Sequence, residues 1–274
     1  MFATDQTMPV HELARAAEER GLYSLYIPEH THIPTSRVTP APMGGDLADE
    51  YSRTVDPFVA LAAAAAVTKH VRLGTGICVV AQREPLVTAK AVATLDQLSG
   101  GRVEFGIGFG WNREEIEHHG VDFATRRDRV REHMLAMKEL WTNDVASFDG
   151  TFVKFEPSWS WPKPVQPGGP PVLIGGQAGP KMFRHIAEYA DGWIPIGGAG
   201  VRAALPELHQ ACEAAGRDPS AMRIVPFGTL PDPGKVDYYA SIGIEEIVLR
   251  VPGGTADTVL PVLDQYAEIV GTGA

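Results

Sequence analysis

Residues 98–115, LSGGRVEFGIGFGWNREE, decide the fold class of this chain. The Ser-Gly-Gly at 99–101 is typical of a helix C-terminus, because glycine readily adopts the left-handed conformation that ends a helix. Residues 102–107 then predict a short strand, and its exit carries a glycine at every second position from 106 to 110. Glycines at period two leave one face of the strand end without side chains, so a flat ligand or another backbone can approach closely there.

The same stretch departs from the G-x-G-x-x-G fingerprint of dinucleotide-binding folds. Its third glycine comes one residue early, and the acidic residue expected at the end of a following strand is missing. A tightly packed barrel strand that binds no ligand is the alternative interpretation of this pattern.

Short apolar strands alternate with helices along the rest of the chain, which is typical of a parallel sheet covered on both faces. Counting Met1 to Ala3 as the tail of a shortened first strand, the sequence contains eight strand–helix units. Eight units favour a closed (β/α)8 barrel of the TIM type over an open sheet. We expect one α/β domain over residues 1–274, with a small hairpin inserted around Asp149-Gly150. The other expected strands cover 22–27, 71–77, 102–107, 171–174, 192–196, 222–227 and 245–251.

Composition excludes several classes of protein. The formal net charge of −10 argues against nucleic acid as a partner. Cys78 and Cys212 lie far apart without metal-ligand spacing, which indicates a reducing compartment and no disulfide. The N-terminus lacks a signal-peptide pattern and no apolar run approaches the roughly 20 residues of a membrane span. The sequence therefore predicts a cytoplasmic protein with no membrane partner.

In such a barrel the active site lies at the carboxyl ends of the strands. The exit of strand 22–27 carries Glu29-His30-Thr31-His32. Histidine suits proton transfer near neutral pH, so we predict His30 as the catalytic acid or base. Glu29 is expected to orient His30 or to favour its protonated form.

Glycine-rich loops at later strand exits indicate a phosphate site. Loops that lead into helix N-termini offer backbone N–H groups and a positive dipole end to an anion. Together with the exit of strand 102–107, where Gly108 and Asn112 lie, they suggest a flat, phosphate-bearing cofactor across the barrel mouth. The glycines of these two loops are Gly175, Gly176 and Gly179 in one and Gly197 and Gly198 in the other.

The segments 29–32, 73–77, 95–112 and 175–198 together resemble the luciferase-like monooxygenase superfamily. Within it, the chain is most similar to actinobacterial coenzyme F420-dependent oxidoreductases. This resemblance implies a barrel that binds F420 or FMN and a homodimer joined through early helices. It also implies that His30 lies near the reactive carbon of the cofactor, with Glu29 as an acidic neighbour. Gly76 and Ile77 correspond to a non-proline cis peptide behind the ring, and the late glycines correspond to the phosphate loops.

One departure from the family bears on the substrate. Sugar-phosphate dehydrogenases of this group carry a glutamate after the Gly-x-Gly, where this chain has Trp111 and Asn112. The difference argues against a sugar phosphate and favours a more apolar pocket. We expect Trp111, Trp159 and Trp161 as its walls, with His32 beside them.

The leading hypothesis is an F420-dependent oxidoreductase that transfers a hydride between the reduced deazaflavin and a small organic substrate. An FMN-dependent monooxygenase using O2 is the alternative, and a catalytically silent flavin-binding barrel is another. A metal-dependent hydrolase using His30 and His32 needs more ligands than the strand exits supply, so we expect no metal. The basic residues at 126–131 are interpreted as a solvated helix face paired with Asp128 and Glu132.

Overall fold

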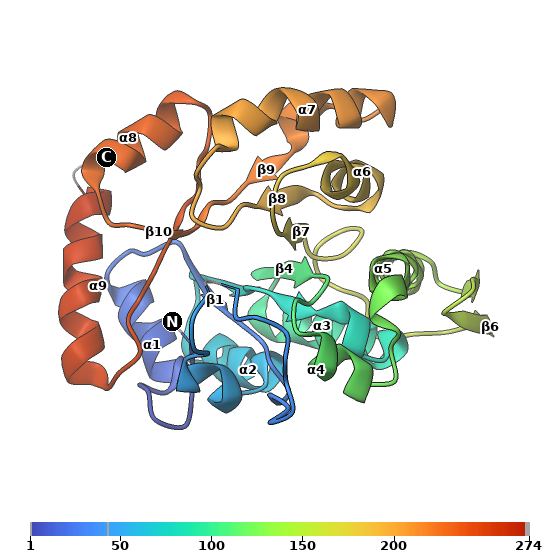
Figure 1. The fold of residues 1–274 in the computed structure, drawn as a ribbon, viewed down its shortest axis with the longest axis horizontal. Helices are drawn as coiled ribbons and strands as arrows, with labels where there is room; N and C mark the ends of the chain where they lie inside the picture. Colours follow the sequence, from blue (N-terminus) through green and yellow to red (C-terminus); the bar gives the residue numbers. More distant parts are fainter. Residues whose placement is uncertain (1, 43, 272–274) are drawn as a thin grey trace.

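A parallel sheet curled into a half-barrel forms the centre of the computed structural model, which describes residues 2–42 and 44–271 (Figure 1). The strands pair in the order expected from the sequence, which confirms the predicted fold class. A bridge between Ile196 and Phe227 joins the main sheet to a second parallel pair. The main sheet contains β1 (Ser24–Ile27), β2 (Arg72–Thr75), β4 (Val103–Gly108), β7 (Val172–Gly175), β8 (Gly192–Ile194) and β9 (Arg223–Ile224), with β3 (Cys78–Val79) paired to β4; the second pair is β10 (Phe227–Thr229) and β11 (Val248–Leu249).

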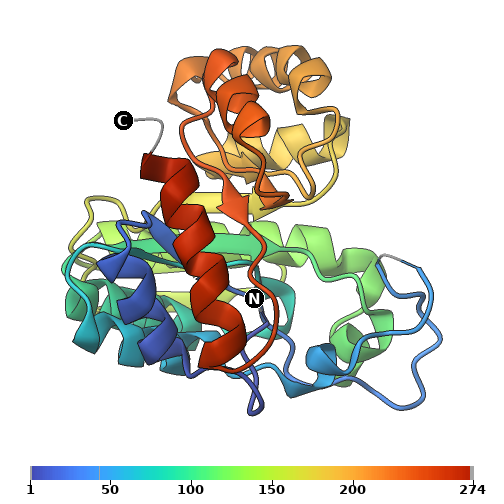
Figure 2. The ribbon, with the colours of Figure 1, turned by 90° about the vertical axis from the view of Figure 1, so that its left-hand side faces the viewer.

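Helices cover the outside of the sheet. Asp56 and Glu84 each cap a helix that begins with proline, so the chain turns from loop to helix at positions the sequence marks. The last helix returns to lie beside the first, as Figure 2 shows. The α-helices are α1 (Val10–Glu19), α2 (Pro57–Val67), α3 (Pro85–Ser99), α4 (Arg113–His118), α5 (Arg126–Thr142), α6 (Pro180–Tyr189), α7 (Val201–Ala214), α8 (Pro233–Ser241) and α9 (Ala256–Gly271); short 3-10 turns are η1 (Asp49–Arg53), η2 (Val80–Gln82), η3 (Phe123–Thr125) and η4 (Pro219–Ala221).

The hairpin predicted around Asp149-Gly150 is confirmed. It consists of β5 (Ala146–Asp149) and β6 (Lys154–Ser158), which pair antiparallel after α5. Among the residues that the structure describes, no helix is both long and apolar enough to cross a membrane.

The expected first strand is the part of the barrel that the structure does not supply. Met1 lies outside the described residues, and Phe2 and Ala3 are not in a strand. Thr4 makes only an isolated antiparallel bridge with Thr54, because Ala3 accepts a hydrogen bond from Val55 of the long loop rather than from the sheet. Within the described ranges, β1 and β11 are therefore not joined by backbone hydrogen bonds.

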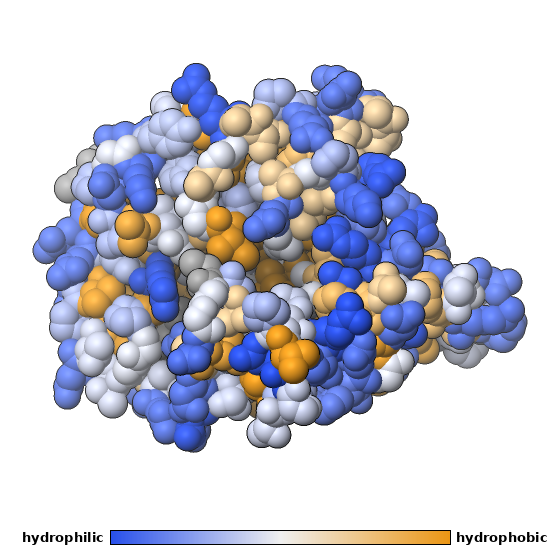
Figure 3. Space-filling view, in the orientation of Figure 1, coloured by the Kyte–Doolittle hydropathy of each residue, from blue (hydrophilic) through white to orange (hydrophobic). Residues whose placement is uncertain are grey.

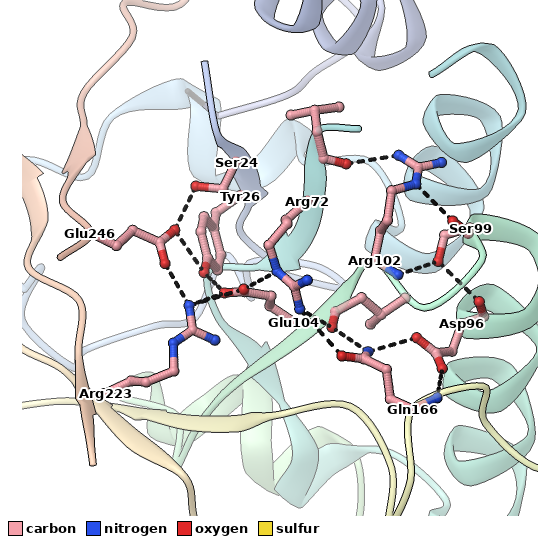
Figure 4. A network of polar contacts seen from close by, with 12 residues as sticks. Ser24, Tyr26, Arg72, Asp96, Ser99, Arg102, Glu104, Gln166, Arg223 and Glu246 are labelled. Atoms are coloured by element: carbon pink, nitrogen blue, oxygen red, sulfur yellow. Dashed lines mark hydrogen bonds and ion pairs between the residues drawn. The ribbon is translucent and has the colours of Figure 1, made fainter. Parts of the chain in front are cut away.

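A buried polar network at the starts of the strands holds this open side together (Figure 4). Glu104 on β4 is fully buried and accepts hydrogen bonds from Tyr26 on β1 and Arg72 on β2. Arg223 on β9 adds a third contact to the same carboxylate at 3.0 Å. Burial and the charge of Glu104 raise the pKa of Tyr26 well above its ordinary value, so the phenol stays neutral and donates.

Glu246, just before β11, extends the network across the gap between the two sheet edges. Its carboxylate accepts hydrogen bonds from Ser24 of β1 at 2.6 Å and from Arg223 at 2.6 Å. The Tyr26 hydroxyl lies 3.3 Å from the same group. Side chains thus connect β1 to the β11 segment where no first strand lies between them.

Candidate functional site

The site is built on a pairing of His30 with Glu115, which the sequence analysis did not single out. The Nδ1 atom of His30 lies 2.6 Å from Oε2 of Glu115, a carboxylate whose residue is only 2% exposed. Since a carboxylate accepts, Nδ1 carries the proton and Nε2 is the nitrogen left for a ligand. The other oxygen of Glu115 accepts from the backbone N–H of Thr31 at 3.0 Å and from Gln82 at 3.3 Å.

The electrostatics of Glu115 favour its ionised form. Burial raises the pKa of Glu115, but the hydrogen bond and charge of His30, with the N–H of Thr31 and the amide of Gln82, outweigh burial and bring it below its ordinary value. An anionic Glu115 can stabilise His30 whenever that ring takes up a second proton.

The prediction that Glu29 orients His30 is wrong, because the carboxylate of Glu29 contacts other groups. Its carboxylate is buried, accepts the N–H of Val79 at 2.8 Å and binds Nε of Arg83 at 2.6 Å. Arg83 in turn binds Asp56 at the start of α2. Glu29 therefore fixes the loops around the strand ends, and the carboxylate that orients His30 is Glu115. The acidic run at 114–115, directly after the glycine-rich stretch, was the sequence signal for it.

Aromatic rings surround His30. Trp111, which was predicted as a wall of the substrate pocket, lies with its ring centroid 5.7 Å from that of His30. Tyr51 of η1 was not foreseen, and its ring lies 5.4 Å from His30. Trp159 and Trp161, also predicted as walls, are instead 80% and 57% exposed. Their connector runs along the outside of α3, where the carbonyl of Trp161 accepts a hydrogen bond from Lys90.

The Gly76–Ile77 peptide bond is cis, as the resemblance implied. The Ile77 side chain fills the space beside two glycines, since a Cβ at Gly108 or Gly175 would lie 2.5 Å or 2.8 Å from it. At Gly106, the carbonyl oxygen of Thr75 comes within 2.0 Å of the Cβ position. The period-two glycines thus allow close packing by backbone and by Ile77, and Gly108 is not open to a flat ligand on that face.

Two buried amides, Asn112 at the N-terminus of α4 and Gln82 against Glu115, have unmet hydrogen-bonding capacity among the described residues. Asn112 is 1% exposed, and neither its Oδ1 nor its Nδ2 has a partner among the described residues. Oε1 of Gln82 is also buried and has no hydrogen-bond partner among the described residues. Buried polar groups normally find partners, so a polar ligand at this face fits the side chains that are present. Seen in the orientation of Figure 1, the surface of the molecule is hollowed near its centre, with apolar residues in its depth (Figure 3).

The glycine-rich loops offer fewer free backbone N–H groups to a phosphate than predicted. The N–H of Gly176 donates to Ile194 at 3.1 Å, and that of Gly197 donates to Phe227 at 2.7 Å. These two groups serve the neighbouring strands and are not free for a phosphate. Gly198 has a φ of +68° and leaves room for Tyr239, whose hydroxyl would lie 1.9 Å from a Cβ there.

A cavity of about 840 Å³ opens at Gly179, where α6 begins, and offers positive charge. Lys181 and Arg184 line it together with Arg127 of α5, whose Nη1 is buried and unpaired among the described residues. The guanidinium of Arg127 lies 4.5 Å from the ring centre of Phe109, which corrects the interpretation of Arg127 as part of a solvated, paired face. An anionic group such as a phosphate would supply the partner that Arg127 lacks.

His32 does not line the cavity at Gly179. It lies beyond the end of β1, on the exposed side. Its Nε2 is 3.0 Å from Nδ1 of His118, and the two rings stack with centroids 5.2 Å apart. Over the described ranges, no group of three or more His, Cys, Asp or Glu residues is arranged to hold a metal ion. The hydrolase alternative therefore gains no support from the positions of His30 and His32.

Glu114 anchors the long loop to α4. Its carboxylate accepts hydrogen bonds from the N–H of Val38 at 2.8 Å and of Thr39 at 3.1 Å and from the Thr39 hydroxyl at 2.6 Å. Burial raises the pKa of Glu114, but these hydrogen bonds prevail and lower it to about 2. Because the pKa is lowered in the folded state, the anchor is fully present above the ordinary carboxyl pKa and is lost as the pH falls through about 2.

We expect Glu114→Gln to accelerate amide hydrogen exchange at Val38 and Thr39 about tenfold at neutral pH, because the amide side chain cannot serve three donors as the carboxylate does. Glu117→Gln on the same helix is the control, since Glu117 is exposed and its carboxylate pairs, among the described residues, with Arg113 at 3.6 Å. Unchanged exchange in Glu114→Gln would show that other contacts hold the loop.

Comparison with known proteins finds similar sequences and structures over most of this chain. A family model described as luciferase-like monooxygenase matches residues 5–230. An uncharacterized protein of Mycobacterium tuberculosis is 42% identical over 271 residues, which cover 97% of this chain and 95% of that protein. The solved structure of monooxygenase RslO1 from Streptomyces bottropensis has a TM-score of 0.80 at 23% identity, covering 97% of this chain and 93% of that one. An F420-dependent secondary alcohol dehydrogenase, solved with an F420-acetone adduct, has a TM-score of 0.76 at 19% identity and covers 96% and 94% of the two chains.

Proposed function

The chain belongs to the luciferase-like monooxygenase family, and we propose that it is an F420-dependent oxidoreductase acting on a small organic substrate. The observation that carries the proposal is the His30–Glu115 pair, together with the buried Asn112 amide that is unpaired among the described residues and caps the helix carrying Glu115. Reduced F420, when bound, supplies the hydride. The chain then has to hold the cofactor, shield the reacting atoms from water and manage one proton.

The residues present suit these tasks. Asn112 and Gln82 would hydrogen-bond the polar edge of the cofactor ring, and Ile77 would support its face. Arg127 of α5 and Lys181 at the start of α6 would bind its phosphate-bearing tail. Nε2 of His30 would give a proton to the substrate oxygen, or take one from it, while ionised Glu115 stabilises the imidazolium form.

Titration of the purified protein with F420 and FMN side by side tests the cofactor. We expect tryptophan fluorescence to be quenched by F420 at concentrations about tenfold below those needed for FMN. Trp111→Phe should remove most of the quenching, because Trp111 lies beside His30. Tighter binding of FMN would favour the monooxygenase alternative, and binding of neither would overturn the proposal.

We also propose that the protein is a homodimer. Val59 on α2 and Val87 and Leu98 on the neighbouring α3 are 73%, 67% and 62% exposed. Apolar side chains gathered on adjacent helices are typical of subunit contacts. Light scattering should give a mass twice the 29.5 kDa of one chain, and Val59→Glu should shift it toward the monomer. A monomeric wild-type protein would refute the proposal.

A further inference from the structure

A continuous series of hydrogen bonds leads from Glu115 to the surface through residues that the proposed chemistry does not use. The Thr31 hydroxyl lies 3.4 Å from Oε1 of Glu115 and 2.7 Å from Nε2 of His119. The same hydroxyl is 3.0 Å from Nδ1 of His32. Nε2 of His32 continues to His118 at 3.0 Å. Glu115 is buried, whereas His118 and His119 are exposed.

We propose that Thr31, His119, His32 and His118 form a proton relay between the His30–Glu115 pair and solvent, an inference that rests on the proposed function. Thr31 is the necessary link of this relay, because its hydroxyl is within hydrogen-bonding distance of the buried carboxylate and of both surface rings. A hydroxyl can accept one proton while it gives up another, and a neutral imidazole can do the same through its two nitrogens.

Each transfer in the relay conserves protons and moves no electrons. When Nε2 of His30 takes a proton from the substrate, its Nδ1–H bond breaks and an O–H bond forms on Glu115. Rotation of the carboxyl group brings this proton to Thr31, whose own proton passes to the ring of His119 or His32. His119 then releases a proton to water from its Nδ1. His32 instead passes a proton from its Nε2 to Nδ1 of His118, which releases one to water from its own Nε2. Reduction of a substrate runs the same steps in reverse.

The charges around the relay suit transient proton carriage. The pKa of Glu115 lies below its ordinary value, so a proton does not rest there. Partial burial lowers the pKa of His119, and the charges of His32 and Arg83 act in the same direction. Glu115 and Glu29 oppose this effect. His119 is therefore largely neutral near pH 7 and able to accept.

Thr31→Val is the decisive variant, because it removes the hydroxyl and retains both the shape of the side chain and the backbone N–H that binds Glu115. Thr31→Ser, which keeps a hydroxyl, is its matched control. The first readout needs no cofactor: exchange of the His30 Nδ1 proton with solvent, followed by NMR on the 15N-histidine-labelled protein. We expect about tenfold slower exchange in Thr31→Val and wild-type exchange in Thr31→Ser.

The second readout is turnover with F420. In dilute buffer, kcat of Thr31→Val should fall about tenfold with little change in KM, and added imidazole should restore it, because a small base can replace a missing relay. Equal exchange rates in the valine and wild-type proteins, or a loss of kcat that imidazole does not restore, would overturn the relay. If F420 fails to bind but exchange still depends on the Thr31 hydroxyl, the proposed function fails and the proton path stands.

Discussion

Replacing Glu115 with glutamine should lower kcat of the F420-dependent reaction by about 10²–10⁴-fold, the range over which a correctly poised acid–base group contributes. Glutamine keeps the size of the side chain and can still contact Thr31 and Gln82. It carries no negative charge, so the imidazolium form of His30 loses the partner that now lies 2.6 Å away. KM should change little, because Glu115 is buried behind His30 and orients it.

The matched control is Glu117→Gln, two positions along α4 and exposed to solvent. It should keep kcat within about twofold of wild type, since a surface ion pair contributes little. His30→Ala should lose about as much activity as Glu115→Gln, and the double variant little more, because residues that act as a unit are not additive. Near-wild-type turnover in Glu115→Gln would mean that the pair is structural.

Replacing Glu104 with alanine should cost about 3–5 kcal/mol of unfolding free energy, the usual effect of removing one partner from a buried ion pair. The change removes the carboxylate that pairs with Arg72. Of the two carboxylates that pair with Arg223 in the described residues, that of Glu246 remains. It also removes the acceptor of the buried Tyr26 hydroxyl. Urea denaturation followed by circular dichroism measures the loss.

Glu245→Ala provides the comparison, because Glu245 lies next to Glu246 in sequence but is exposed. Its unfolding free energy should stay within about 0.5 kcal/mol of wild type. A loss below about 1 kcal/mol in Glu104→Ala would indicate that the side chains across the open side of the half-barrel do not hold it together.

The sequence by itself determined the order of the strands and helices, the hairpin, and the strand ends at which the candidate site residues lie. The Ser-Gly-Gly stop before β4 is a local signal, and the structure ends α3 at Ser99 and begins β4 at Val103, as predicted. His30 and Trp111 come together because each follows the carboxyl end of a parallel strand. The cis bond at Gly76–Ile77, implied by family resemblance, is also confirmed.

Only the tertiary structure decided which side chains pair. Glu29 and Glu115 both follow strand ends, and although the acidic pair at 114–115 marks Glu115 as a candidate, the sequence does not show which of the two carboxylates meets His30. Their roles depend on the position of Arg83 and on the direction of α4. Arg83 forms an ion pair with Glu29. Helix α4 brings Glu115 to His30. The same limit explains Trp159 and Trp161: the departure from the sugar-phosphate dehydrogenases suggested an aromatic wall, but the path of the connector along α3 leaves both exposed.

The open side of the barrel also separates what the sequence determines from what the tertiary structure decides. A count of strand–helix units predicts closure, because each unit is a local pattern of apolar residues. Closure itself depends on hydrogen bonds between distant edges, and in the described residues Ala3 and Thr4 bond to the loop around Thr54 instead. Local periodicity therefore fixes which elements form, whereas pairing across long sequence separations fixes which charges and which edges meet.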